Sequence, residues 1–224
     1  LSATMPFTAK AQDKVEASVG ADFVSNYIWR GTDCGGVSIQ PSMGVSYKGL
    51  SLAAWGSVGI DKEDAREIDL TLGYNTGGFN VSVTDYWFSY HKEDGGYTGD
   101  YFKYGAHSTV HIFEATLGYD FGPLALSWNT YFAGDDYTKE NGDRAYSTYV
   151  GISAPFKLGG LDWSAEVGLT PWEGAYANKF NVTNLTLKAE KEIKFTNSFS
   201  LPTFAQVTFN PHTQGAYFVF GVSF

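Results

Sequence analysis

The amino-acid sequence predicts an all-β protein, a twelve-stranded antiparallel transmembrane β-barrel. Apolar and polar residues alternate along most of the 224 residues, as expected when side chains point to opposite faces of a strand. The connections between these stretches alternate between tight turns and mostly longer polar loops. Aromatic residues gather near both ends of the outward-facing rows. Long strands, connections sorted by end and two aromatic levels are together typical of membrane-spanning barrels.

The end of the chain shows this pattern clearly. Phe218, Phe220, Val222 and Phe224 share one face of an expected strand, and the other face is smaller or more polar. An apolar edge strand invites aggregation in a soluble protein, whereas a closed barrel has no free edge. A terminal Phe resembles the assembly signal of bacterial outer-membrane barrels. The stretch would also suit the buried terminal strand of a soluble sandwich, so the rest of the chain must decide.

Composition agrees with a barrel and limits the partners. Aromatic residues and charged residues each make up 17% of the chain, which is poor in the Lys and Glu of soluble helical proteins. No apolar run approaches the roughly 18 residues of a membrane helix. The formal net charge of -9 disfavours nucleic acid as a partner. The single cysteine, Cys34, excludes an intramolecular disulfide and is interpreted as a bystander.

The first residues are interpreted separately from the barrel. Residues 9–11 read Ala-Lys-Ala, a small-x-small pattern that precedes signal-peptide cleavage points. Residues 1–11 are therefore expected to be a signal-peptide remnant or an N-terminal tail. The barrel is expected to span 12–224.

The first expected strand is long and covers 13–30, with Tyr27 and Trp29 on its outward face. After a loop at 31–36, the second strand contains Pro41, which cannot donate to the ladder and predicts a bulge or kink. In the fifth strand, strict alternation would place Asp85 in lipid, so a β-bulge that turns it inward is predicted. The expected strands cover 13–30, 37–48, 50–60, 67–74, 79–90, 110–119, 124–133, 146–156, 161–171, 183–193, 199–209 and 216–224.

The connections predict the orientation. Tight turns near Gly49, Gly77, Gly122 and Gly159 are expected in the periplasm, and the loops 91–108 and 134–144 outside the cell. The outward aromatic residues follow the same division, as expected for rings at the two membrane interfaces. Near the short turns these are Tyr47, Tyr74, Phe79, Tyr119, Phe156, Phe199 and Phe224, and near the long loops Trp29, Trp87, Phe132, Tyr146, Trp172 and Phe209.

The first four strands carry motifs in a recognisable order. Residues 24–31 read Val-Ser-Asn-Tyr-Ile-Trp-Arg-Gly and are followed by Gln-Pro at 40–41, Trp-Gly-Ser at 55–57 and Glu-Ile-Asp-Leu at 67–70. This order and spacing resembles the TorF-like family of Gram-negative outer-membrane proteins. The stretch from 113 to 119 resembles it more loosely, and the rest shows only a general barrel pattern. The resemblance implies an outer-membrane barrel, with no established substrate and no catalytic residues to carry over.

The polar rows are expected to line the barrel lumen, where acidic residues outnumber basic ones. Arg30 and Glu67 are expected near the outer mouth, where the guanidinium suits bidentate pairing with a carboxylate. Inward rings at Trp55, Tyr86 or Trp87, Tyr131, Tyr149 and Phe204 would narrow a pore. If the lumen is plugged instead, its charged core is expected to include Arg30, Glu67, Asp69 and Glu114. The expected charged lining residues are Asp22, Arg30, Glu67, Asp69, Glu114, Glu166, Lys188 and Glu190.

These observations favour a porin-like channel of the Gram-negative outer membrane for small, cationic or neutral polar solutes. The alternative is a non-conducting barrel with a plugged polar lumen that acts as an accessory subunit or binds through its surface loops. An outer-membrane hydrolase is less favoured, because none of the four histidines has the spacing of a known catalytic site. No catalytic residue, metal site or cofactor is predicted. The expected partners are membrane lipids or lipopolysaccharide, small solutes and an outer-membrane protein.

Overall fold

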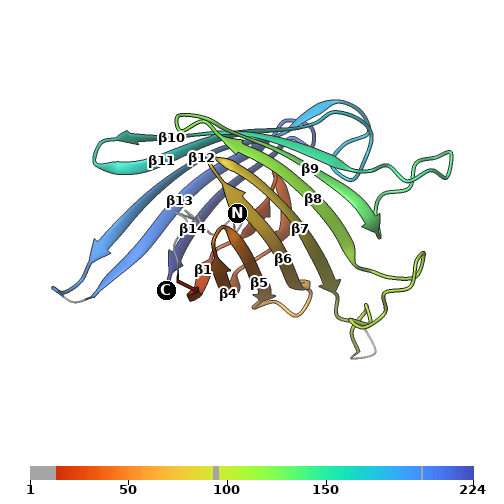
Figure 1. Cartoon of the computed structure of the whole chain (residues 1–224), viewed down its shortest axis with the longest axis horizontal. Coiled ribbons are helices and arrows are strands. Elements are labelled where there is room, and N and C mark those ends of the chain that lie inside the picture. The colour runs from red at the N-terminus through yellow and green to blue at the C-terminus, as the bar shows by residue number, and fades with distance from the viewer. Residues whose placement is uncertain (1–13, 93–95, 198) are drawn as a thin grey trace.

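The computed structural model describes residues 14–92, 96–197 and 199–224, and it is a closed twelve-stranded antiparallel barrel (Figure 1). The predicted all-β fold of twelve antiparallel wall strands is therefore confirmed. Within the described ranges there is no helix that is long and apolar enough to cross a membrane. The proposed leader remnant at residues 1–11 lies outside the described residues.

Every wall strand pairs with the strands before and after it, and the first pairs with the last to close the barrel. The closing contact between β1 and β14 is short and joins Asp22, Phe23 and Val24 to residues 221–223. The wall strands are β1 (Glu16–Val24), β4 (Ser38–Tyr47), β5 (Leu50–Gly59), β6 (Arg66–Thr76), β7 (Phe79–Ser89), β8 (Ile112–Asp120), β9 (Ala125–Gly134), β10 (Thr148–Leu158), β11 (Leu161–Thr170), β12 (Asn181–Lys194), β13 (Ser200–Asn210) and β14 (Gly215–Ser223).

The connections are sorted by end, as the sequence predicts. Tight turns join β4 to β5, β6 to β7 and β10 to β11 at one end, and Gly49 and Gly77 adopt the positive φ values that these turns require. The longer connections, between β7 and β8, β9 and β10, and β11 and β12, gather at the other end, toward the right of Figure 1. We refer to the two ends as the short-turn end and the long-loop end.

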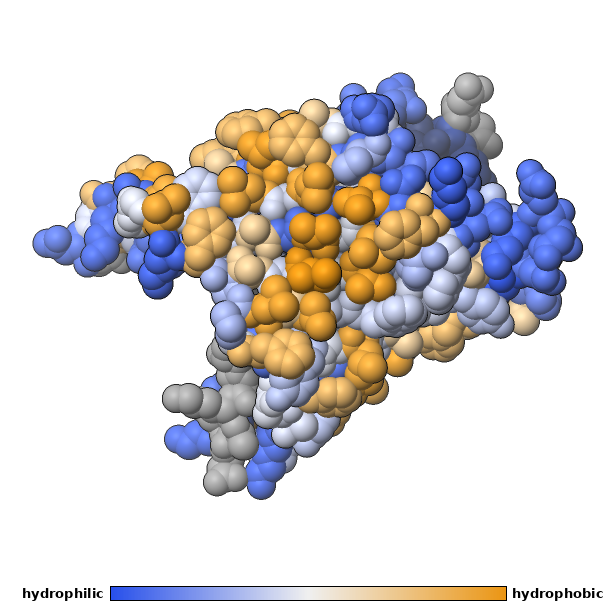
Figure 2. Space-filling model, turned by 90° about the horizontal axis from the view of Figure 1, so that it is seen from above, coloured by the Kyte–Doolittle hydropathy of each residue, from blue (hydrophilic) through white to orange (hydrophobic). Residues whose placement is uncertain are grey.

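Apolar side chains cover the outside of the wall. Val81, Val83, Leu70 and Leu72 are all exposed on neighbouring strands, whereas Thr84 and Tyr86 point inward and are buried. Figure 2 shows one face of the molecule, with apolar residues across its middle and hydrophilic residues toward both ends. An apolar patch of this extent on a folded surface marks a membrane or protein contact. Most of the predicted outward aromatic residues are exposed, namely Tyr47, Tyr74, Phe79, Tyr119, Phe156, Phe199 and Phe224, and Phe132, Tyr146, Trp172 and Phe209.

The first strand differs from the prediction. β1 ends at Val24, and the chain then leaves the wall to form a hairpin of two short strands, β2 (Tyr27–Trp29) and β3 (Thr32–Gly35). Tyr27 is buried and Trp29 packs against Tyr86, a ring on the inner face of the wall. Their predicted outward positions are therefore wrong. The alternation of the sequence continues past residue 24 because the hairpin strands are also extended, so the pattern alone does not reveal the departure.

Neither position at which the sequence predicts a bulge shows a register shift, although the ladder between β4 and β5 is interrupted at Pro41, where a kink is the alternative. The pairing of β4 with β5 omits Gln40 and Pro41, but the register on both sides of the gap is the same. β7 keeps its register with β6 and β8 through Asp85, so the Asp85 side chain stays on the outer face. A register shift occurs instead in the next pair of strands, between Phe113 and Glu114 of β8 where it meets β9.

Asp85 remains on the outer face because the chain covers it with a partner. Nδ1 of His111 lies 2.7 Å from Oδ1 of Asp85, and Nε2 of His111 lies 2.7 Å from the carbonyl oxygen of Tyr101. Both ring nitrogens of His111 therefore lie within hydrogen-bond distance of an oxygen atom. The rings of Tyr101 and Tyr104 pack on His111 and shield the pair. A covered contact with His111 thus replaces the inward turn that the sequence predicts. Trp87 is also half-buried beneath Tyr101.

Candidate functional site in the barrel lumen

The hairpin formed by β2 and β3, which we call the lumen hairpin (residues 25–36), lies inside the long-loop end of the barrel. Its two strands pair with each other and form a sheet separate from the wall. The chain reverses at Arg30 and Gly31, which both have positive φ. A Cβ atom on Gly31 would lie 1.9 Å from the carbonyl oxygen of Thr183 on β12, so only glycine fits this approach. Asn210 donates a hydrogen bond of 3.0 Å to the carbonyl oxygen of Gly31.

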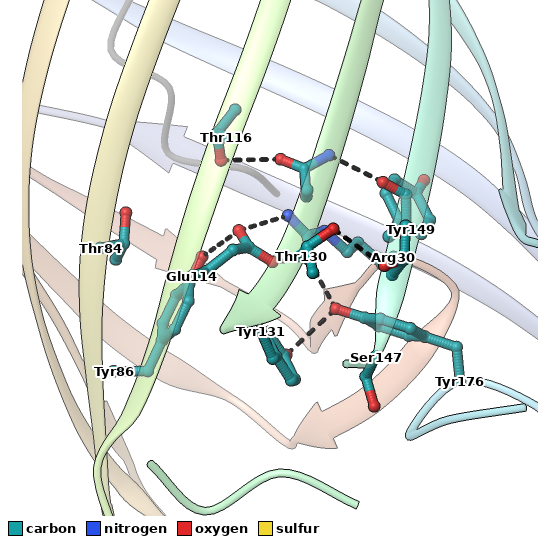
Figure 3. Close-up of polar contacts among 12 residues, drawn as sticks. Arg30, Thr84, Tyr86, Glu114, Thr116, Thr130, Tyr131, Ser147, Tyr149 and Tyr176 are labelled. Atoms are coloured by element: carbon teal, nitrogen blue, oxygen red, sulfur yellow. Dashed lines mark hydrogen bonds and ion pairs between the residues drawn. The ribbon is translucent and has the colours of Figure 1, made fainter. Parts of the chain in front are cut away.

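The reversal directs Arg30 at a carboxylate on the opposite wall. The two terminal nitrogens of Arg30 donate to the two oxygens of Glu114, with distances of 2.5 Å and 2.8 Å (Figure 3). The side chains are 6% and 2% exposed. Tyr86 donates a third hydrogen bond of 2.9 Å to Glu114. Bidentate guanidinium–carboxylate pairs are among the strongest hydrogen-bonded contacts in proteins.

Aromatic rings surround the guanidinium group. The Cζ atom of Arg30 lies 4.3 Å from the ring centroid of Trp29, 4.7 Å from that of Tyr149 and 5.8 Å from that of Tyr176. Arg30 also donates a hydrogen bond of 2.5 Å to the hydroxyl of Tyr176, which in turn donates to Tyr131. Cations over aromatic faces gain additional attraction when they are removed from water. We call Glu114, Tyr86, Tyr131, Tyr149 and Tyr176 the guanidinium cage.

Tyr176 comes from the connection between β11 and β12, which also folds into the long-loop end. Trp172 donates to the carbonyl oxygens of Ala145 and Tyr146, each at 3.1 Å, and the backbone N–H of Ala175 donates to the Ser147 hydroxyl at 2.8 Å. These bonds tie the connection to the start of β10. Tyr176 is therefore positioned by its own loop as well as by Arg30.

Burial and charge set the protonation of the hairpin contact. Burial by itself would lower the pKa of Arg30, but the negative charge of Glu114 raises it well above its ordinary value. Arg30 therefore carries its charge at every accessible pH. Burial also raises the pKa of the Tyr176 hydroxyl to about 12, so this group stays neutral and can donate to Tyr131.

An apolar cluster lies on the other side of the hairpin. Ile28 packs with Val24, Phe204 and Val219, all buried, and Tyr27 packs against Trp55 with ring centroids 5.4 Å apart. Burial of such side chains stabilises the folded state by about 1.5–3 kcal/mol each. The lumen hairpin is therefore held by apolar packing as well as by the ion pair.

The structure separates the charged residues that the sequence predicts in the lumen into distinct groups. Arg30 pairs with Glu114 and not with Glu67, because the reversal at Gly31 carries the guanidinium across the lumen. Glu67 is buried and Asp69 half-buried on the inner face of β6. One buried oxygen of Asp69 has no hydrogen-bond partner among the described residues. Asp22 is half-buried opposite Ser223.

The other predicted residues lie beyond the cage. Glu166 accepts hydrogen bonds from Tyr149 at 2.5 Å and from Asn184 at 3.0 Å. Lys188 and Glu190 form an ion pair of 2.5 Å in which Glu190 is more than half exposed. Near them, at the short-turn end, a cavity of about 210 Å³ is lined by Asp162, Glu190, Lys191, Glu192, Pro202, Thr203, Phe204 and Ser223. The two ends of the lumen therefore differ in how fully they are filled.

Sequence reasoning missed Trp29 and Tyr176 as members of the site. Tyr176 lies in a stretch without alternation, and a loop residue gives no sign of which way it folds. One feature of the sequence could have indicated the hairpin. Three glycines, Gly31, Gly35 and Gly36, lie close together and flank two short extended segments. Glycines bracketing short extended runs are typical of a hairpin with an irregular turn.

Comparison with known proteins adds no family. Among the described residues, no group of three or more His, Cys, Asp or Glu side chains is arranged to hold a metal ion. No family model matches the chain, and no curated protein matches it significantly.

Proposed function

We propose that this protein is a Gram-negative outer-membrane barrel and a porin-like channel for small cationic or neutral polar solutes, closed at rest by the lumen hairpin. The closed barrel and the exposed apolar side chains on its outer surface support placement in a membrane. The long-loop end is then the outer mouth and the short-turn end faces the periplasm. The resemblance to TorF-like proteins agrees with this placement.

The observation that carries the proposal is that the hairpin is a separate sheet. Its strands, β2 and β3, share no ladder with the wall, and the base of the hairpin is joined to β14 by a hydrogen bond of 2.9 Å from the Ser25 N–H to the carbonyl oxygen of Phe220. The part beyond Ser25 can therefore move without breaking the ladder between β1 and β14. Barrels of eight strands are filled by side chains and those of sixteen leave a channel, so a barrel of twelve can enclose a pore once an inserted segment withdraws. The hairpin is therefore proposed as the gate.

The charges of the lumen give the proposed selectivity. Arg30 and Lys188 are each paired with a carboxylate, which leaves Glu67, Asp69 and Glu166 to attract cations. An acidic passage raises the local concentration of cations. The open channel is expected to prefer cations, and its conductance is expected to fall as acidification protonates the carboxylates.

Single-channel recording in planar bilayers tests this function. We expect rare openings in the wild-type protein and steady, cation-selective conductance after Arg30→Ala, which removes the attachment to Glu114. Lys157→Ala serves as the matched control, because Lys157 belongs to an exposed ion pair at the short-turn end. In the open variant, changing Asp69 and Glu166 to Asn and Gln should reduce the selectivity measured from reversal potentials in a salt gradient. A folded Arg30→Ala protein that shows faster amide exchange in the hairpin but no conductance would reject the channel.

A non-conducting barrel that binds a partner through its loops is the second candidate. The connection between β7 and β8 supports it, because Phe102 is 88% exposed and lies beside Tyr101 and Tyr104. Exposed aromatic residues on a loop are suited to contact with a sugar or another protein. Loss of binding to lipopolysaccharide or to outer-membrane extract after Phe102→Ala would favour this function. A hydrolase remains the less favoured alternative, and turnover of phospholipid or peptide would identify it.

A further inference from the structure

The guanidinium cage has the composition of a ligand-binding site, and the group that occupies it comes from the lumen hairpin, whose strands form a sheet separate from the wall. Glu114 accepts two parallel hydrogen bonds, Tyr176 accepts another, and the rings of Tyr149 and Tyr176 face the cation. Planar bidentate pairing and stacking on aromatic faces distinguish a guanidinium from an ammonium group. The cage therefore presents the carboxylate and the rings that suit a guanidinium.

The cage recognises only the end of the Arg30 side chain. The two terminal nitrogens are hydrogen-bonded, whereas the buried Nε atom has no hydrogen-bond partner among the described residues. The cage therefore forms no hydrogen bond with Nε, and the alkyl stem between Nε and the backbone has no group that could form one. A different molecule that presents the same terminal group would satisfy the same acceptors.

The cage is also assembled by contacts that do not involve Arg30. The Tyr149 hydroxyl donates to Glu166 and accepts from Asn184 at 3.0 Å. The Tyr86 hydroxyl donates to Glu114, and the loop bonds described above position Tyr176. Because their partners lie on the wall or its loops, these side chains are expected to keep their places when the hairpin leaves. Preorganisation of this kind reduces the entropy cost of binding a new occupant.

We propose that the guanidinium cage is a binding site for solutes that carry an alkylguanidinium group, and that Arg30 occupies it at rest as a tethered substitute for such a solute. This inference rests on the proposed function, since it names the class of solute that would enter the channel. A guanidinium solute that takes the place of Arg30 also removes the ion pair that holds the hairpin. The same exchange therefore binds the solute and weakens the attachment of the gate, which apolar packing continues to hold.

Titration calorimetry on the purified, detergent-solubilised full chain tests the site without requiring conductance. In Arg30→Ala, where the cage is vacated, we expect saturable binding of guanidinium and of ethylguanidinium at millimolar, non-denaturing concentrations. Urea is the matched neutral control, because it has the shape of guanidinium without the charge. Methylammonium carries the charge without two parallel N–H donors, so it tests whether the cage requires bidentate pairing. Urea and methylammonium should each bind at least tenfold more weakly than guanidinium. Adding Glu114→Gln to Arg30→Ala should abolish the binding of guanidinium.

The outcomes separate this inference from the channel. If Arg30→Ala fails to fold, Arg30→Met keeps the packing of the stem and leaves only the terminal group absent. A folded Ala or Met variant that binds guanidinium no better than urea would overturn the site, even if that variant conducts. Saturable guanidinium binding in a variant without conductance would support the site while rejecting the channel. Wild-type protein should bind more weakly than Arg30→Ala, because Arg30 competes for the cage.

Discussion

The two ends of the barrel contain ion pairs of the same length in opposite surroundings. Arg30 and Glu114 at the long-loop end are 2.5 Å apart with side chains 6% and 2% exposed, and Lys157 and Asp162 at the short-turn end are also 2.5 Å apart but 85% and 64% exposed. Water and salt screen the second pair, whereas the first pair has lost its water. Burial rather than distance thus decides which pair holds the structure together.

The surroundings differ in the same way. Rings and hydroxyl groups on several wall strands and one loop meet around Arg30. The exposed pair instead joins two residues, Lys157 and Asp162, that already face each other across the neighbouring strands β10 and β11. A contact that spans the lumen couples distant parts of the chain. A contact within a hairpin only repeats a pairing that the backbone already makes. Four changes test this comparison.

Arg30→Ala should have the largest effect. It leaves Glu114 buried without its charged partner, and breaking a buried pair in this way costs about 3–5 kcal/mol. We expect that loss in the free energy of unfolding, measured by denaturant titration in lipid vesicles, together with faster amide exchange across residues 27–35. Unchanged exchange in the hairpin would show that apolar packing of Ile28 alone keeps it in place.

Gly31→Ala should release the hairpin by a different route. The positive φ costs alanine about 1–2 kcal/mol, and the added methyl group would also collide with the carbonyl oxygen of Thr183. Gly77→Ala is the matched control, because Gly77 also has positive φ but has open space around its Cβ position. Amide exchange in residues 27–35 should therefore rise in the first variant and stay as in wild type in the second.

Tyr149→Phe should have an intermediate effect. It keeps the ring beside Arg30 but removes the hydroxyl that contacts Glu166 and Asn184. Leaving buried polar partners unsatisfied costs about 1–3 kcal/mol. We expect that loss of stability without the rise in hairpin exchange that Arg30→Ala causes. Release of the hairpin by Tyr149→Phe would mean that the wall hydroxyls, and not the ion pair, hold it.

Lys157→Ala should have the smallest effect. An exposed pair contributes about 0–1 kcal/mol, so the free energy of unfolding should change by less than that amount. The difference from wild type should shrink further in molar salt, which screens exposed charges over about 3 Å. A loss similar to that of Arg30→Ala would contradict the claim that burial separates the two pairs.

The sequence by itself determined the wall of this barrel. Side-chain alternation is a property of each extended segment, so Val81, Val83 and Thr84 reveal their faces without knowledge of any partner strand. Turn glycines such as Gly49 and Gly77 likewise mark tight connections through the φ values that they permit. Strand number, the sorting of connections and most of the outward aromatic residues follow from these local rules.

Only the tertiary structure decided what fills the lumen. Residues 25–36 are extended whether they continue β1 or fold inward, so alternation does not distinguish the two paths. The partner of Arg30 lies 84 residues away on β8, and Tyr176 reaches the same point from a loop. Asp85 likewise stays outside because His111 reaches it across the connection from β7 to β8. Such contacts depend on closure of the barrel, which brings distant residues together after the local pattern has been fixed.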